Sequence, residues 1–132
     1  MVLLRALARP MLAVIFVTGG IEVLRKPHPR AEQAAPVIDR VRQAVPVLPA
    51  DPVTLVRANA AVHMVAGAML ATGRAPRLAA GLLAASLVPT TIGGHRFWAI
   101  DDPVERARQR THVGKNLAIL GGLLLAATDD AS

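Results

Sequence analysis

Four long and nearly charge-free apolar segments constrain the fold of this chain more than any other feature. They cover residues 3–21, 54–72, 78–94 and 113–128. Each approaches the roughly 20 residues that an α-helix needs to cross a bilayer. The basic residues inside them, such as Arg5 and Arg57, lie near an end, where long side chains reach the headgroups. The pattern predicts an all-α membrane protein, a single four-transmembrane-helix bundle over residues 1–132. The expected helices are about 3–22, 54–72, 77–94 and 111–128.

Two alternatives to this bundle are open from the sequence. A soluble four-helix protein would carry a polar stripe on every helix. Residues 79–94 offer only Ser86, Thr90 and Thr91, and residues 117–128 end in a single threonine. A cleaved signal peptide would end at a small residue pattern, whereas the first apolar segment runs into TGGIEVLRKP. Both alternatives are therefore disfavoured.

Composition excludes several kinds of chemistry. The chain has no cysteine, which rules out a disulfide, a thiolate metal site or an iron–sulfur cluster. Any redox chemistry must use a bound cofactor or a partner's cysteines. The formal net charge is +6, but no basic patch is interleaved with aromatic residues. We expect the basic excess to face anionic lipid, with no nucleic-acid partner.

The longest connection, residues 30–53, carries its own helical pattern. Val37, Ile38, Val41 and Val45 recur at helical spacing, and polar residues take the other side. This favours a short amphipathic helix lying on the membrane surface between the first two spans. A proline-rich loop is the alternative.

The basic residues also predict an orientation in the membrane. Arg5, Arg9, Arg74 and Arg77 fall on one side, and the other basic residues fall on the opposite side. The positive-inside bias places the 1–2 and 3–4 connections in the cytoplasm. The expected location is a bacterial plasma (inner) membrane, crossed several times.

Polar side chains gather toward one end of the predicted bundle, since the first and third spans end where the second and fourth begin. We expect these residues to turn inward and form a ligand- or partner-binding cluster, because polar groups in hydrocarbon need partners. They are Glu22, Asn59, His63, His95, His112, Lys115 and Asn116.

Simpler roles for members of this cluster are open. For Glu22 an ion pair with Arg57 or Lys115 is favoured over a ligand or proton role, and for His63 a hydrogen-bonded packing role is favoured over a ligand role. A bis-histidine haem needs two histidines at matched depth, which the sequence does not favour. We expect no metal site, because Glu22 alone among the carboxylates is well placed. No catalytic residue is identified.

Three further assignments concern the region around the last span. Phe97 and Trp98 are expected to anchor the chain at the membrane interface. Gly114, Ala118 and Gly122 form a small-residue stripe that permits close helix packing. Residues 101–110 are expected to form a solvated loop.

An ordered set of motifs runs along most of the chain. The set begins with GGIEVLRKP at residues 19–27 and LVPTT at residues 87–91. It continues with His95, Phe97, Trp98, His112, Lys115, Asn116 and Leu117, and closes with Gly121–Gly122–Leu123. This set resembles the DoxX family of small bacterial membrane proteins, actinobacterial members in particular. The resemblance implies four transmembrane helices and an association with redox chemistry, since the family takes its name from a small subunit linked to quinone-coupled thiosulfate oxidation.

From this resemblance we expect an accessory or anchoring subunit of a membrane redox complex near the quinone pool. We expect the isolated chain to have no catalytic activity of its own. Its partner would be a soluble oxidoreductase or a respiratory-chain protein. Association of the chain into a homo-oligomer is compatible with this role. The alternatives are a small-molecule or lipid carrier and an autonomous quinone- or haem-dependent oxidoreductase. A quinone is a compatible cofactor; haem is not favoured.

Overall fold

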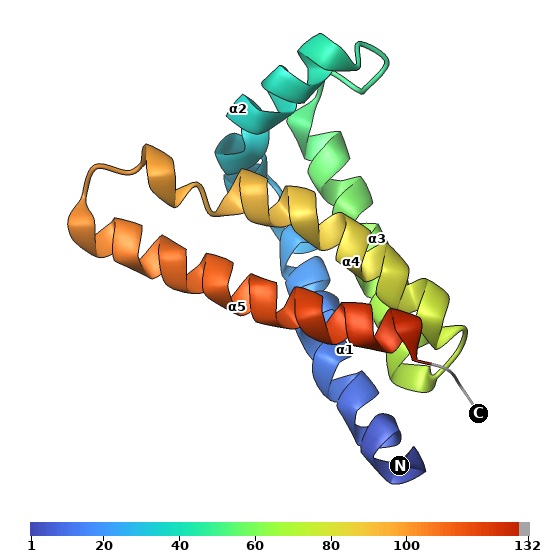
Figure 1. Ribbon diagram of the computed structural model, residues 1–132. Coiled ribbons are helices and arrows are strands. Elements are labelled where there is room, and N and C mark those ends of the chain that lie inside the picture. The colour runs from blue at the N-terminus through green and yellow to red at the C-terminus, as the bar shows by residue number, and fades with distance from the viewer. Residues whose placement is uncertain (130–132) are drawn as a thin grey trace.

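The computed structural model describes residues 1–129, and these residues form helices without any strand (Figure 1). The last three residues of the expected domain lie outside the described residues. The elements are α1 (Val2–Arg25), α2 (His28–Ala44), α3 (Pro52–Thr72), α4 (Pro76–Gly94), the short 3-10 helix η1 (Phe97–Ala99) and α5 (Pro103–Thr128). The all-α prediction is therefore confirmed.

Three helical segments are long and apolar enough to cross a membrane. They are Val2–Arg25, Pro52–Thr72 and Pro76–Ala99. Helix α5 has 26 residues and so has the length, but its first half carries most of its polar residues. A fourth span therefore stays a prediction.

Helix α5 begins at Pro103, eight residues before the start predicted from hydropathy. Asp102 accepts a hydrogen bond from the Val104 amide at 3.2 Å, and proline follows at the first helical position. Glu105 then pairs with Arg108 at 2.7 Å and accepts a hydrogen bond from Gln109 at 2.7 Å. These contacts favour helix in a segment predicted to be a solvated loop, so that prediction is wrong for residues 103–110.

Helices α1 and α3 pack most closely, and glycine makes their approach possible. A Cβ added to Gly20 would lie 2.6 Å from Met64 Cγ and 2.9 Å from the Ala60 carbonyl oxygen. A Cβ added to Gly67 would lie 2.9 Å from Val17 Cγ2. Small residues let helix backbones approach in this way, so the two glycines permit the close contact between α1 and α3.

The tight glycine packing occurs on different helices from those predicted. Gly114 and Ala118 are exposed, and a Cβ at Gly114 would meet open space. A Cβ at Gly122 would only touch Leu12 at 3.5 Å. Because α5 turns Asn116 and Leu123 inward instead, the predicted small-residue stripe faces mostly outward, and its packing role is not supported.

The start of α1 and the end of α5 lie near each other at the end of the molecule opposite α2 (Figure 1). Arg5 pairs with Asp129 at 2.8 Å, and the Arg77 guanidinium donates to the Ala127 carbonyl at 3.2 Å. Nearby, Leu70, Leu83 and Leu123 are fully buried. This end of the bundle is closed by packing and polar contacts.

The opposite end is covered by α2, which packs against α3 and α4. Ala31 is buried there, and Gln33 donates a hydrogen bond to the Gly94 carbonyl. The amphipathic helix predicted between the first two spans therefore exists, over a longer range than its valine pattern indicated. Its position at a membrane surface stays a prediction.

Candidate ligand cavity

A partly open cavity of about 670 Å³ lies beneath α2 and is lined by residues of all five α-helices. Its walls are mainly aliphatic, with contributions such as Ile15, Val37, Val41 and Leu55. Its polar and charged lining residues are Arg30, Asn59, His63, Thr90, His95, His112, Lys115 and Asn116. Sites for small ligands typically measure about 300–1,000 Å³ and combine apolar walls with a few polar groups. The cavity has the size and composition of such a site.

The structure brings together six of the seven residues predicted to cluster: Asn59, His63, His95, His112, Lys115 and Asn116. Glu22 is the exception. It is exposed, and no ion pair joins it to Arg57 or Lys115 among the described residues. Helix α1 presents Gly19 and Val23 to the cavity, and Glu22 is not among the lining residues. The alternative role of Glu22, an ion pair with Arg57 or Lys115, is therefore not supported within residues 1–129.

His63 is the one buried polar side chain among the described residues, with 8% of its surface exposed. Its ring lies edge-on to Phe16, with the ring centroids 5.2 Å apart. Its Nε2 atom is buried and has no hydrogen-bond partner in the part of the chain that the structure describes. Unpartnered buried polar atoms are rare in proteins, and this one belongs to a residue that lines the cavity, which makes His63 a candidate contact for a bound group.

Two amides connect neighbouring helices beside His63. The Asn59 side chain of α3 donates to the Thr90 hydroxyl at 2.8 Å, and Asn116 of α5 donates to the Thr91 hydroxyl at 2.9 Å. Sequence reasoning missed the role of the two threonines. Adjacent positions on a helix point about 100° apart, so two consecutive threonines on α4 can reach α3 and α5. Their adjacency in the sequence could have indicated this role.

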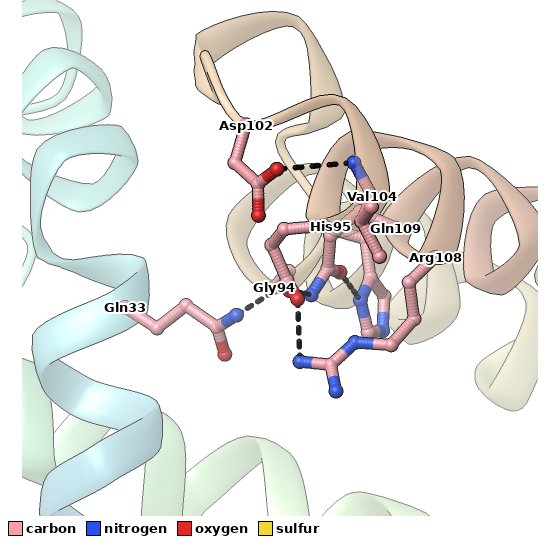
Figure 2. Close-up of polar contacts among 8 residues, drawn as sticks. Gln33, Gly94, His95, Asp102, Val104, Arg108 and Gln109 are labelled. Carbon is pink, nitrogen blue, oxygen red and sulfur yellow. Dashed lines mark hydrogen bonds and ion pairs between the residues drawn. The ribbon is translucent and has the colours of Figure 1, made fainter.

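The other two histidines that line the cavity stack face to face at the α4–α5 connection. The ring centroids of His95 and His112 are 4.8 Å apart and the rings are inclined by 9°. His95 Nδ1 lies 2.7 Å from Gln109 Oε1, as Figure 2 shows. Parallel stacked rings do not present nitrogens from opposite sides of one iron, so this pair does not fit a bis-histidine haem.

Glu105 accepts a hydrogen bond from Gln109 and so extends the series of hydrogen bonds that begins at His95. It lies in the polar first half of α5. Hydrogen bonds from Gln109 and then Arg108 lower the pKa of the Glu105 carboxyl. The carboxylate is therefore held in its charged form and is already partnered by α5 itself. Glu105 does not line the cavity.

Helix α2 supplies two residues that the sequence analysis did not single out, Arg30 and Gln33. The Gln33 amide reaches across to the Gly94 carbonyl (Figure 2), and Arg30 donates to Gln33 Oε1 at 3.3 Å. Arg30 also lines the cavity. Arg30 and Gln33 continue the helical spacing of Val37 and Val41 toward the N-terminus. The sequence pattern could therefore have placed them on the same face of α2.

The aromatic pair lies beside the cavity rather than in it. Phe97 and Trp98 form η1, with ring centroids 5.4 Å apart, and Trp98 is 58% exposed. Their anchoring role at an interface stays a prediction. The described residues contain no group of three or more His, Asp or Glu side chains able to hold a metal ion.

Apolar helices around an amphipathic cavity define a helical membrane protein with a candidate small-molecule site. Residues 4–96 match the DoxX family model. This is more than half of the chain, so the protein belongs to the DoxX family. The match covers α1 to α4, and α5 with His112, Lys115 and Asn116 lies beyond it. Searches of curated proteins and of solved structures returned no match.

Proposed function

We propose that this protein is an accessory membrane subunit whose cavity holds a small amphipathic molecule drawn from the bilayer. The supporting observation is the cavity itself, with aliphatic walls and polar groups gathered from α2, α3, α4 and α5. Such a molecule would place its polar head near these groups and its apolar part along the walls. The proposal includes four spans, with the apolar second half of α5 as the fourth.

A quinone is compatible with this cavity. The unpartnered Nε2 of His63 and the nearby Asn59 amide could hold a carbonyl oxygen of the head, and the apolar walls would receive the ring. A bound quinone would supply two-electron redox chemistry. The residues of this chain would orient the head and exclude water.

An accessory role fits the lining better than independent catalysis. The cavity lining contains no carboxylate, and the chain contains no cysteine. The lining therefore offers histidines that could transfer protons, but no carboxylate or thiol to act with them. A soluble oxidoreductase or another respiratory protein at the plasma membrane would supply the reaction.

A carrier of small molecules or lipids is the second candidate, favoured by the partly open cavity and the polar pair Asn59 and His63 inside it. It predicts substrate flux in liposomes that His63→Ala abolishes. An autonomous oxidoreductase would instead purify with a coloured or quinone cofactor and turn over without a partner.

The cavity is tested with a matched pair of glycine substitutions. A Cβ at Gly19, which lines the cavity, or at Gly121, on the exposed side of α5, would meet no atom within 4 Å. Gly19→Leu should therefore fill the cavity without a clash, and Gly121→Leu should leave it open.

The measurement is mass spectrometry and an absorption spectrum of small molecules retained after mild-detergent purification. We expect wild type and Gly121→Leu to retain an amphipathic molecule, and Gly19→Leu to retain about tenfold less, as a loss of about 1.4 kcal/mol would give. Equal retention in all three proteins, or none in any, contradicts the proposal.

A further inference from the structure

We infer that the cavity selects an anionic amphiphile, a molecule with one hydrocarbon chain and an oxyanion head held at a cationic mouth. This inference rests on the proposed function, because it names the class of molecule that the same cavity takes. It differs from the quinone case in the charge of the head.

The mouth of the cavity is positively charged. Arg30 and Lys115 both line it, and both are exposed, which places them where it opens. They come from different helices, α2 and α5, so their charges converge from two sides. Arginine binds an oxyanion through a planar pair of N–H donors, and lysine binds it as a point charge.

No negative charge offsets these residues within the lining. The cavity is lined by no Asp or Glu. The acids of α2, Glu32 and Asp39, are exposed and outside the lining, and Glu105 is paired with Arg108. A cavity with apolar walls and charge of one sign focuses its field on an entering ion of the opposite sign.

The stacked histidines border the same charged residue. His95 and His112 line the cavity with their centroids 4.8 Å apart, and Lys115 follows His112 by about one helical turn. An imidazole N–H can donate a hydrogen bond to an oxyanion head, so the rings supply polar contacts beside the charge of Lys115.

The remaining lining suits a single hydrocarbon chain. The cavity is also lined by Val37, Ile38 and Val41 of α2 and by Leu55 and Val56 of α3. A volume of about 670 Å³ lies in the usual range for one drug-sized ligand. The occupant is therefore a single-chain amphiphile with a carboxylate or phosphate head.

The chain offers a matched control, since Lys115 and Lys26 are its two lysines. Both are exposed, but Lys26 follows α1 and does not line the cavity. Lys115→Gln and Lys26→Gln remove the same charge, and Lys115→Arg retains the charge at the mouth.

The experiment measures the binding of radiolabelled oleate and of an oleoyl lysophosphatidate to the purified full chain in detergent. Neutral monoolein and a decyl-quinone are the uncharged probes. We expect Lys115→Gln to weaken binding of the anions about tenfold, and Lys26→Gln and Lys115→Arg to bind them as wild type does. Monoolein binding should be weak and unchanged by every lysine substitution. Preference for oleate or for the lysophosphatidate identifies a carboxylate or a phosphate source.

Four outcomes overturn the inference. The first is monoolein binding as tight as that of oleate, and the second is a loss of oleate binding in Lys26→Gln as large as that in Lys115→Gln. Uptake of the quinone alone also overturns it but leaves the proposed function standing, provided that Gly19→Leu abolishes that uptake. Failure of every probe to bind overturns both.

Discussion

The unpartnered ring nitrogen of His63 is the residue-scale feature that ties the fold to a ligand. The side chain is 8% exposed, and its only ring contact among the described residues is the edge of Phe16. A buried donor or acceptor without a partner costs about 1–3 kcal/mol. A protein that only needed packing here would be more stable with an apolar ring.

His63→Phe should therefore stabilise the ligand-free protein by about 1 kcal/mol and weaken ligand retention. The phenyl ring retains an aromatic contact with Phe16 and removes the unpartnered nitrogen. Unfolding in detergent measures the first effect, and mass spectrometry of retained molecules measures the second. His28→Phe, at an exposed position, is the control and should leave retention unchanged. Loss of stability with unaltered retention would show that His63 is a packing residue.

At the scale of helices, the crossing of α1 and α3 depends on a missing side chain at Gly20. The Cβ of an alanine there would lie 2.6 Å from Met64 Cγ and 2.9 Å from a backbone carbonyl oxygen. The methionine side chain can move, but the Ala60 carbonyl cannot. The two helices must therefore separate, and the cavity wall formed by Phe16, Gly19 and His63 moves with them.

Gly20→Ala should accordingly destabilise the protein by about 1–3 kcal/mol, the usual range for overpacking. Gly81→Ala on α4 is the matched control, because a Cβ at Gly81 would meet no atom within 4 Å. We expect Gly81→Ala to be neutral or slightly stabilising, since alanine favours helix over glycine. Comparison of the two denaturation midpoints in detergent checks this. Equal midpoints would mean that the α1–α3 crossing is looser than the structure shows.

At the scale of the whole molecule, the number of membrane spans and the orientation together decide on which side of the membrane each connection lies. If α5 crosses the membrane, Asp101 and Asp129 lie on opposite sides of it; if it does not, they share a side. The positive-inside bias further places Asp101 and Gln43 in the cytoplasm, with Arg74 and Asp129 outside.

The absence of native cysteine makes this directly measurable with single-cysteine variants. In intact cells, a membrane-impermeant maleimide should label Arg74→Cys and Asp129→Cys. It should reach Gln43→Cys and Asp101→Cys only after the cells are opened. Labelling of Asp101→Cys and Asp129→Cys under the same conditions would reduce the bundle to three spans. Labelling of the opposite set would reverse the orientation.

The sequence by itself determined the all-α class, the approximate positions of the apolar helices and the end at which polar residues gather. These follow from the length and hydropathy of each segment, which are local properties. Successive membrane helices run in opposite directions, so the sequence could place six polar residues at the same end of the bundle. They are Asn59, His63, His95, His112, Lys115 and Asn116. The start of α5 was missed because Asp102 and Pro103 favour a helix where hydropathy indicates none.

The tertiary structure alone decided how each helix is rotated about its axis and what covers the cavity. A helix that is apolar on most sides does not specify by pattern which side turns inward, so only packing could exclude Glu22 and turn Gly114 outward. The same holds for α2, whose docking brings Arg30 and Gln33 to residues more than 60 positions away, at the end of α4. Such contacts depend on the fit of several helices at once, and no single segment encodes them.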